Sequence, residues 1–280
     1  MELWHKRLWH MSEKGLQVLA RKFLIPLAKN ESLSSCDYCL IGKQHRISFS
    51  SKSKNKLEKL ELVCSNVCGP MDLETFGGNR YFITFIDDAT RKLWICLLKS
   101  NDQVFQYFLQ IYAMVERKNG KKLKCLMFDN GGEYTSREFE TYYTKKGIRH
   151  EKTVPSTPQL NGVVERMNHI TIERVRCMPK TAKLSKVVWG EATKTTYYLI
   201  NRSPSCLEKA WTRKYVSYSH LRVFGCKTFV HVPKEQRSKL DDKPVPHVLV
   251  GYGDEEFGFR LWDPTKKKLV RSRDVVFQDD

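Results

Sequence analysis

The chain has 280 residues, enough for about two or three small domains that each bury a hydrophobic core. Its 49 Lys and Arg residues outnumber 31 Asp and Glu residues, and the net charge of +18 favours an extended anionic partner such as DNA. No apolar run approaches the ~20 residues of a membrane span, and the N-terminus lacks the apolar segment of a signal peptide, so we expect no membrane partner. The odd number of nine cysteines then indicates a reducing compartment, nuclear or cytoplasmic, rather than secretion.

Residues 1–48 contain two pairs of candidate metal ligands. His5 and His10 lie near the N-terminus, and Cys36 and Cys39 follow as a C-x2-C pair. Two imidazoles and two thiols suit a tetrahedral structural Zn²⁺ site, and the metal would supply much of the stability of so short a segment. The sequence therefore predicts a small helical zinc-binding domain over residues 1–48.

Two other interpretations of these residues remain open. Cys36 and Cys39 also have plausible zinc spacing with Cys64 and Cys68, although this second pair falls on or beside a predicted strand. The histidines could instead flank an amphipathic helix beside two free thiols. A polar stretch rich in Ser and Lys follows over residues 49–58 and has the composition of a linker.

From Leu60 the hydrophobic pattern changes to short strands and helices. Apolar runs bounded by turn residues predict strands at residues 60–67, 81–88, 93–98, 123–128 and 148–152. Apolar residues at helical spacing predict helices at residues 104–116, 136–146 and 162–177. Three strands, a helix and then alternating strands and helices follow the order of an RNase H-like α/β core.

Two carboxylates stand out within this core. Asp129 follows the apolar run 126–128, and Glu165 lies in the first turns of the helix that Asn161 opens, with 35 residues between the two acids. A carboxylate at a strand end and another on a later helix can hold divalent cations such as Mg²⁺. Taken singly, Asp129 could belong to a D-N-G-G turn and Glu165 to a solvated helix face.

The segments around these acids resemble a known family. The chain reads D-N-G-G-E-Y from Asp129 and P-S-T-P-Q-L-N-G-V-V-E-R-M-N from Pro155, which resembles the integrase of copia-type LTR retrotransposons. The resemblance implies a DDE-type integrase core within a Pol polyprotein, acting in DNA integration by 3′-end processing and strand transfer with two Mg²⁺ or Mn²⁺ ions. It also implies that Asp129 and Glu165 are ligands of the catalytic metal.

The resemblance extends toward the N-terminus. H-x-R-L-x-H from His5 and C-x-x-C from Cys36 resemble the zinc-binding pre-integrase domain of the family, with Trp9 where the family usually has Gly. The F-I-D-D segment that ends in Asp87 and Asp88 resembles the second core strand of the family, so we interpret this acidic pair as structural.

The third carboxylate of the family's triad is missing from this sequence. The segment L-E-L-V-C-S-N-V-C-G-P resembles the first core strand of the family, in which an Asp follows the Ser. Asn66 stands at that position, and Cys64 stands where His is often found. Asn offers one neutral carbonyl oxygen where Asp offers two anionic ones. We therefore expect Asn66 to be a degenerate catalytic position and metal binding at Asp129 and Glu165 to be weakened.

Residues on the helix of Glu165 are candidates for contact with DNA. Asn161, Asn168 and His169 share a helical face with Glu165 and would face the substrate. The arginines of the same helix could contact phosphates or form a plain solvated face, and they are Arg166, Arg174 and Arg176.

The C-terminal third departs from the family in two places. Pro179 is expected to interrupt the helical run, and the connection over residues 205–220 is shorter than in the family. Residues 189–200 resemble the next helix of the family, and short alternating strands from residue 223 predict a small five-stranded β-barrel. The predicted parts are a zinc-binding domain (1–48), a linker (49–58), an RNase H-like core (59–217) and a β-barrel (218–280).

These features support two hypotheses about function. One is an integrase that acts on element ends and target DNA, as a homo-oligomer when functional, and is impaired at Asn66. The other is a non-catalytic DNA-binding remnant or a host-recruited DNA-binding protein. Asn66, Pro179 and the short connection favour the loss of catalysis.

Overall fold

The computed structural model describes residues 1–27, 32–43, 57–128, 131–152, 158–203, 211, 216–233, 235, 237, 238, 243–253 and 258–278. The chain forms two compact units. The first, which we call the terminal unit, comprises residues 1–44, 173–199 and 217–280. The second, the core unit, comprises residues 45–172 and 200–216. No helix in the described part of the chain is both long and apolar enough to cross a membrane.

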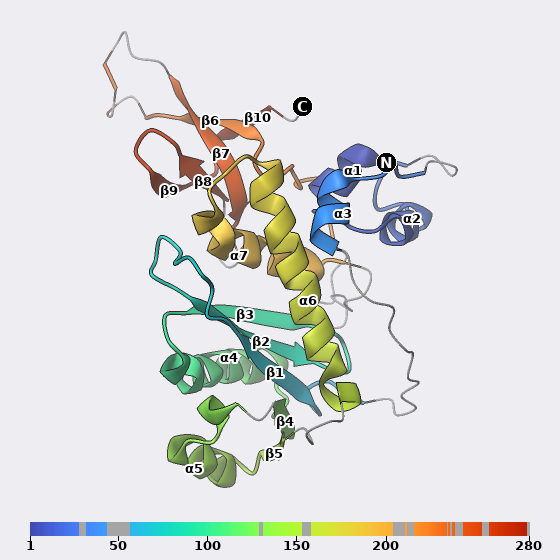
Figure 1. Ribbon diagram of the computed structural model, residues 1–280, viewed down its shortest axis with the longest axis vertical. Helices are drawn as coiled ribbons and strands as arrows, with labels where there is room; N and C mark the ends of the chain where they lie inside the picture. Colours follow the sequence, from blue (N-terminus) through green and yellow to red (C-terminus); the bar gives the residue numbers. More distant parts are fainter. Residues whose placement is uncertain are drawn as a thin grey trace. The chain divides into compact units, whose positions relative to one another are not determined.

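The core unit is built on a mixed five-stranded sheet with the strand order β3-β2-β1-β4-β5 (Figure 1). β1, β2 and β3 pair antiparallel, whereas β4 pairs parallel with β1 and β5 parallel with β4. This is the sheet expected for an integrase core. The strand bounds lie within about three residues of those predicted and are β1 Val63–Cys68, β2 Tyr81–Asp87, β3 Leu93–Leu98, β4 Cys125–Phe128 and β5 Arg149–Lys152.

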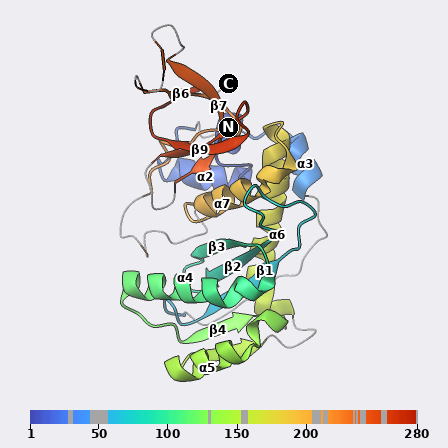
Figure 2. The same ribbon diagram turned by 90° about the vertical axis from the view of Figure 1, so that its left-hand side faces the viewer.

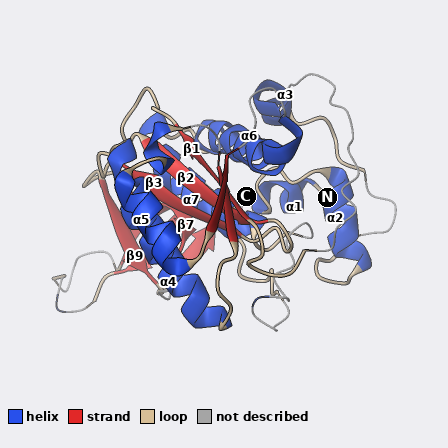
Figure 3. Ribbon diagram, turned by 90° about the horizontal axis from the view of Figure 1, so that it is seen from below, coloured by secondary structure: helices blue, strands red, loops and turns tan. Residues whose placement is uncertain are grey.

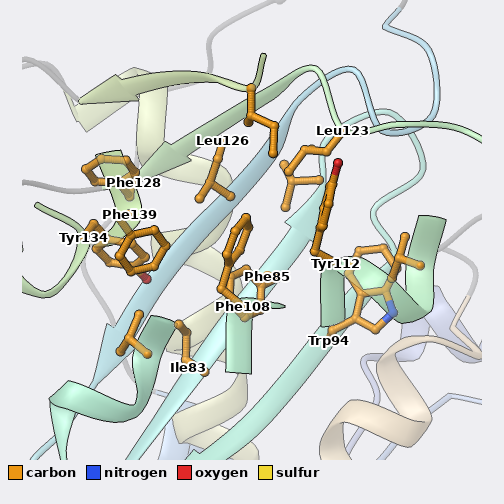
Figure 4. Close-up of a cluster of buried hydrophobic side chains, with 14 of the residues drawn as sticks. Ile83, Phe85, Trp94, Phe108, Tyr112, Leu123, Leu126, Phe128, Tyr134 and Phe139 are labelled. Atoms are coloured by element: carbon orange, nitrogen blue, oxygen red, sulfur yellow. The ribbon is translucent and has the colours of Figure 1, made fainter. Parts of the chain in front are cut away.

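Helices α4 (Val104–Asn119) and α5 (Arg137–Lys146) lie against one face of this sheet (Figures 2 and 3). Side chains alternate along each strand, so every second residue points into the layer between the sheet and these helices. That layer is the main apolar core of the unit (Figure 4) and includes Ile83, Phe85, Trp94, Phe108, Tyr112, Leu126, Phe128, Tyr134 and Phe139. The residues between them on β1 and β2, among them Asn66 and Thr84, point to the opposite face.

Local sequence signals set the ends of these two helices. α4 ends at Gly120, which has a φ of 64°, a left-handed conformation that glycine adopts without steric cost. Ser136 precedes α5, and its hydroxyl accepts a hydrogen bond from the backbone N–H of Phe139 at 3.4 Å. One-turn 3-10 helices occur at Asn101–Gln103, Gly132–Tyr134 and Lys186–Val188.

The prediction that the helix breaks at Pro179 is wrong, because Pro179 lies inside helix α6 (Pro158–Thr181). The helix continues through this proline and ends two residues later. A proline near the end of a helix removes only one backbone donor, and the turns that follow are still bonded. The N–H of Ala182 donates to the carbonyl of Met178 at 3.0 Å, and that of Leu184 donates to the carbonyl of Pro179 at 2.9 Å.

The terminal unit contains a second five-stranded sheet in which all neighbouring strands are antiparallel, in the order β10-β6-β7-β8-β9. Its strands are β6 Lys227–His231, β7 Pro244–Tyr252, β8 Phe259–Asp263, β9 Lys268–Ser272 and β10 Val275–Gln278. This agrees with the five short strands predicted after residue 223. The helices of the unit, besides the end of α6, are α1 Glu2–Arg7, α2 Glu13–Arg21, α3 Asp37–Lys43 and α7 Trp189–Ile200.

Helix α7 is fastened to the second sheet by polar contacts. The hydroxyl of Thr195 donates to the carbonyl of Val250 at 3.0 Å, and the guanidinium of Arg260 donates to both carboxylate oxygens of Glu191. Gly251 permits this approach, because a Cβ there would lie 2.7 Å from the Thr195 hydroxyl. These contacts explain why residues 173–199 group with the sheet, a division that cuts across the predicted 59–217 part.

Trp9 links the N-terminal residues to the same unit. Its indole is 1% exposed and lies edge-on to Phe224, with 4.7 Å between ring centroids. Its φ of 58° falls in the left-handed region, which explains why a glycine would suit this position. In this chain the burial of the indole offsets the backbone strain.

Trp9→Ala is expected to destabilise the terminal unit by about 3–5 kcal/mol, because it empties a large buried site. Trp9→Gly should cost less than Trp9→Ala, because glycine relieves about 1–2 kcal/mol of left-handed strain. Chemical denaturation of the full chain would measure both values, with Trp4→Ala on α1 as the control. Equal or reversed costs for Gly and Ala would contradict the role given to the φ of Trp9.

Candidate functional site

Four candidate ligands meet at the N-terminal end of the terminal unit. His5, His10, Cys36 and Cys39 each direct one ligand atom into a cluster in which these atoms lie within 4.8 Å of one another. Nδ1 of His10 lies 3.0 Å from Nε2 of His5 and 3.3 Å from each cysteine sulfur. Two nitrogen and two sulfur donors gathered this closely fit the donor set of a structural zinc site.

The fold brings the two histidines together by reversing the chain after α1. Trp9 and His10 both have left-handed φ values, 58° and 61°, and the backbone N–H of His10 donates to the carbonyl of His5 at 2.7 Å. The remaining ring nitrogen of His5, Nδ1, lies 2.8 Å from the carbonyl of Met11. This contact places the proton on Nδ1, so the lone pair of Nε2 faces the cluster.

The rival ligand pair lies elsewhere. Cys64 and Cys68 belong to β1 of the core unit, while Cys36 and Cys39 share the cluster with the histidines. Burial, with a contribution from Asp88, raises the pKa of Cys64 to about 12, so its thiol is protonated at neutral pH. Among the described residues, the cluster of candidate metal ligands does not include Cys64 or Cys68.

Asn66 takes part in a hydrogen-bond chain on the face of the core sheet opposite to α4. It lies on β1 directly across from Thr84 on β2. Its side-chain Oδ1 accepts a hydrogen bond from Nδ2 of Asn168 at 2.9 Å, and Oδ1 of Asn168 accepts from the Thr84 hydroxyl at 2.7 Å. The single oxygen that Asn66 could offer a cation is therefore already an acceptor.

Asn168 occupies a different place from the one expected. The sequence predicted a substrate-facing residue, but Asn168 is only 8% exposed, and its amide is used to hold Asn66 and Thr84. Asn168 does lie beside the degenerate position, Asn66. Asn168 can be buried against the sheet because Thr84, a polar residue on the otherwise apolar strand β2, donates a hydrogen bond to it.

Of the two acids expected to bind metal, the structure describes Glu165 but not Asp129. β4 ends at Phe128, which lies across from Ser65, so the chain leaves the sheet next to Asn66, as the predicted topology requires. Asp129 itself lies outside the described residues, as does the side chain of Asn161. Glu165 is exposed on α6.

The basic residues of α6 divide into two groups. Arg166, His169 and Arg176 are exposed, as a contact with DNA requires. Arg174 is half-buried with a buried Nη1, and burial lowers its pKa to about 10, opposed by the charges of Glu173 and Cys39. This placement argues against the phosphate contact predicted for Arg174.

Asp87 has the structural role inferred from the sequence. Its carboxylate accepts hydrogen bonds from the backbone N–H of Leu60 at 2.8 Å and from the N–H of Thr90 at 3.0 Å. Burial raises the pKa of this carboxyl group. The group fastens the turn after β2 and lacks the exposure of a catalytic metal ligand.

Comparison with known proteins supplies a family for this architecture. The GAG-pre-integrase domain family matches residues 1–44, the integrase core domain family residues 59–158, and the retroviral polymerase SH3-like domain family residues 226–280. The chain is 64% identical to a retrovirus-related Pol polyprotein from transposon TNT 1-94 of Nicotiana tabacum, over 100% of the chain and 22% of the polyprotein. It is 30% identical to the corresponding polyprotein from transposon RE1 of Arabidopsis thaliana, over 99% of the chain and 19% of the polyprotein.

A solved structure is similar to part of the chain. The HTLV-2 integrase catalytic core domain, in complex with magnesium, aligns with 52% of this chain and 90% of its own length, at 16% identity and a TM-score of 0.40.

The mixed sheet, the His/Cys cluster before it and the antiparallel sheet after it define the class, which is an integrase core of the retroviral and retrotransposon type. The three domain matches and the 64% identity to a retrotransposon Pol polyprotein are consistent with a fragment of a copia-type Pol polyprotein. It spans about a fifth of the length of the curated relatives it matches, 22% and 19%.

Proposed function

We propose that the chain is a DNA-binding integrase region whose strand-transfer chemistry is impaired at Asn66. The observation that carries the proposal is the hydrogen bond from Asn168 to Oδ1 of Asn66. A neutral side chain whose only oxygen is already an acceptor is a poor partner for a divalent cation. The alternative of a weakened enzyme that uses Asn66 as a neutral ligand is less consistent with this contact.

The residues of an intact site would have separate roles. Mg²⁺ or Mn²⁺ would activate a water or a 3′-hydroxyl and stabilise the leaving oxygen of the phosphodiester. Asp129 and Glu165 would hold the metal, and residue 66 would supply the charge nearest to the reacting phosphate. In this chain Asn66 supplies no charge. Only the carboxylates of Asp129 and Glu165 would then offset the repulsion between the two cations.

The His/Cys cluster has a structural role in this proposal. His5, His10, Cys36 and Cys39 would hold Zn²⁺ and fix the fold of the pre-integrase domain, residues 1–48. The linker 49–58, the core 59–217 and the β-barrel 218–280 complete the proposed division of the chain. A functional form would be a nuclear or cytoplasmic homo-oligomer on element ends and target DNA.

A strand-transfer assay tests the catalytic half of the proposal. Purified full chain is expected to join no detectable labelled element-end DNA to target DNA with either Mg²⁺ or Mn²⁺. Joining that depends on metal and is lost in Glu165→Gln would show that the site is active with Asn66 in place.

Binding to duplex DNA is expected to be independent of the DNA sequence. The net charge of +18 attracts the phosphate backbone, which is the same for every base sequence. The logarithm of the binding constant should fall linearly with the logarithm of salt concentration, as phosphate contacts release counterions. Arg166→Gln should reduce that slope by about 1, as expected when one phosphate contact is lost. Arg91→Gln is the control, because Arg91 is paired with Asp88 at 2.6 Å. A flat salt dependence of the full chain would contradict DNA binding.

A further inference from the structure

The four ligands of the proposed zinc site all come from the first 44 residues. One of them, His10, also contacts a residue at the end of α6. His10 directs Nδ1 toward the cluster, and its other ring nitrogen, Nε2, lies 3.3 Å from the hydroxyl of Thr181. Thr181 is the last residue of α6, far away in the sequence, and belongs to the same compact unit.

The hydroxyl of Thr181 is placed to accept a hydrogen bond from His10 rather than to donate one to it. It donates its own hydrogen to the carbonyl of Cys177 at 3.0 Å. Its lone pairs are then left for the N–H of His10. The contact holds the proton on Nε2 and keeps Nδ1 as a lone pair that faces the sulfur atoms. His10 is 4% exposed, so losing this contact would remove a hydrogen bond from a buried ring nitrogen.

The same stretch of α6 also supports the helix that carries Cys39. The thiol of Cys177 donates to the carbonyl of Tyr38 in α3 at 3.1 Å. Gly42 of α3 faces the same thiol, and a Cβ there would overlap the sulfur of Cys177. The helix that carries Cys39 and the second histidine thus both contact one short segment, residues 177–181.

We propose that Thr181 is a positioning residue of the metal site, and that the end of α6 completes a site whose ligands lie in the N-terminal domain. The inference rests on the proposed zinc site. It predicts that metal binding by the N-terminal ligands and order at the end of α6 depend on each other. Outer partners of ligating histidines typically change metal affinity about 10–100-fold.

The test uses full-length protein and Co²⁺ or Zn²⁺ in competition with a chelator of known affinity. Thr181→Val should still bind one metal ion per chain, but about tenfold or more weakly. Thr181→Ser, which keeps the hydroxyl, should bind like the unmodified chain. Thr193→Val is the matched control, because the hydroxyl of Thr193 makes the same bond to the carbonyl four residues earlier, Trp189, at 2.8 Å in α7.

Hydrogen exchange gives a second measurement that needs no variant. Adding metal to the metal-free chain should slow amide exchange over residues 178–184 as well as over residues 1–43. Unchanged exchange over residues 178–184, or equal affinity for Thr181→Val and Thr193→Val, would overturn the role of Thr181. If the unmodified chain binds no metal, or if Cys36→Ser binds it equally well, the zinc site itself is wrong.

Discussion

Asn66→Asp is expected to turn a chain with no detectable strand transfer into one that joins DNA in the presence of Mg²⁺. The change restores a full negative charge at the point closest to both cations. Metal-site electrostatics contribute several kcal/mol to such barriers, and each ~1.4 kcal/mol is tenfold in rate, so the gain should be at least about a hundredfold. The side-chain N–H of Asn168 that donates to Asn66 could donate equally to an Asp at position 66. A carboxylate would keep this bond with one oxygen and have the other for metal.

Three measurements separate the possible reasons for the outcome. Calorimetry should show Mg²⁺ binding to Asn66→Asp and little to the unmodified chain. Combining Asn66→Asp with Glu165→Gln should abolish joining again, while DNA binding stays unchanged in all three proteins. The continuity of α6 through Pro179 removes one expected obstacle to rescue. Binding of Mg²⁺ without any joining would place the defect elsewhere, for example in the connection over residues 205–220, which lies largely outside the described residues.

Cys36→Ser is expected to lose the metal and to unfold much of the terminal unit. Structural zinc supplies about 10–16 kcal/mol of apparent binding free energy in zinc-finger peptides, which is comparable to the ~5–15 kcal/mol stability of a whole domain. The effect should reach beyond the N-terminal residues, because Trp9 packs against Phe224 beside the second sheet. Metal content by atomic spectroscopy and hydrogen exchange over residues 227–278 would measure both effects.

Cys68→Ser is the matched control for this loss. Cys68 has the spacing of the rival ligand set but lies on β1 of the core unit. We expect Cys68→Ser to keep one zinc ion per chain. Loss of zinc in Cys68→Ser would instead favour the rival ligand set, in which Cys64 and Cys68 join Cys36 and Cys39. The full chain is required, because residues 1–44 are packed into one unit with residues 173–199 and 217–280.

The sequence predicted those features that depend on short patterns. Apolar runs identified β1 to β4 of the core sheet, because these strands are buried on at least one face. The ligand spacing of His5, His10, Cys36 and Cys39 identified the cluster, because metal sites limit which residue types can meet. Asn66 was identified as a departure only through the family resemblance.

Other features depend on contacts between distant residues and could not be predicted. Helical periodicity placed Asn168 and Arg174 on α6, but burial of these side chains is set by Thr84 and by the neighbourhood of Cys39. Pro179 gives a local signal for a helix end, yet the helix continues because one lost donor near the end costs little. Thr181 has no local signal at all, since its partner lies 171 residues away.

The terminal unit is assembled from three separate stretches of chain, with most of the core unit inserted between the first two. During synthesis the ribosome releases Trp9 long before Phe224, so the indole cannot contact Phe224 while the intervening residues are made. Contacts between residues so far apart in the sequence form late and slowly. The metal ligands emerge first, residues 45–172 can fold next, and the second sheet comes last. Until residues 217–280 have left the ribosome, Trp9 therefore lacks the contact with Phe224 that it makes in the folded unit.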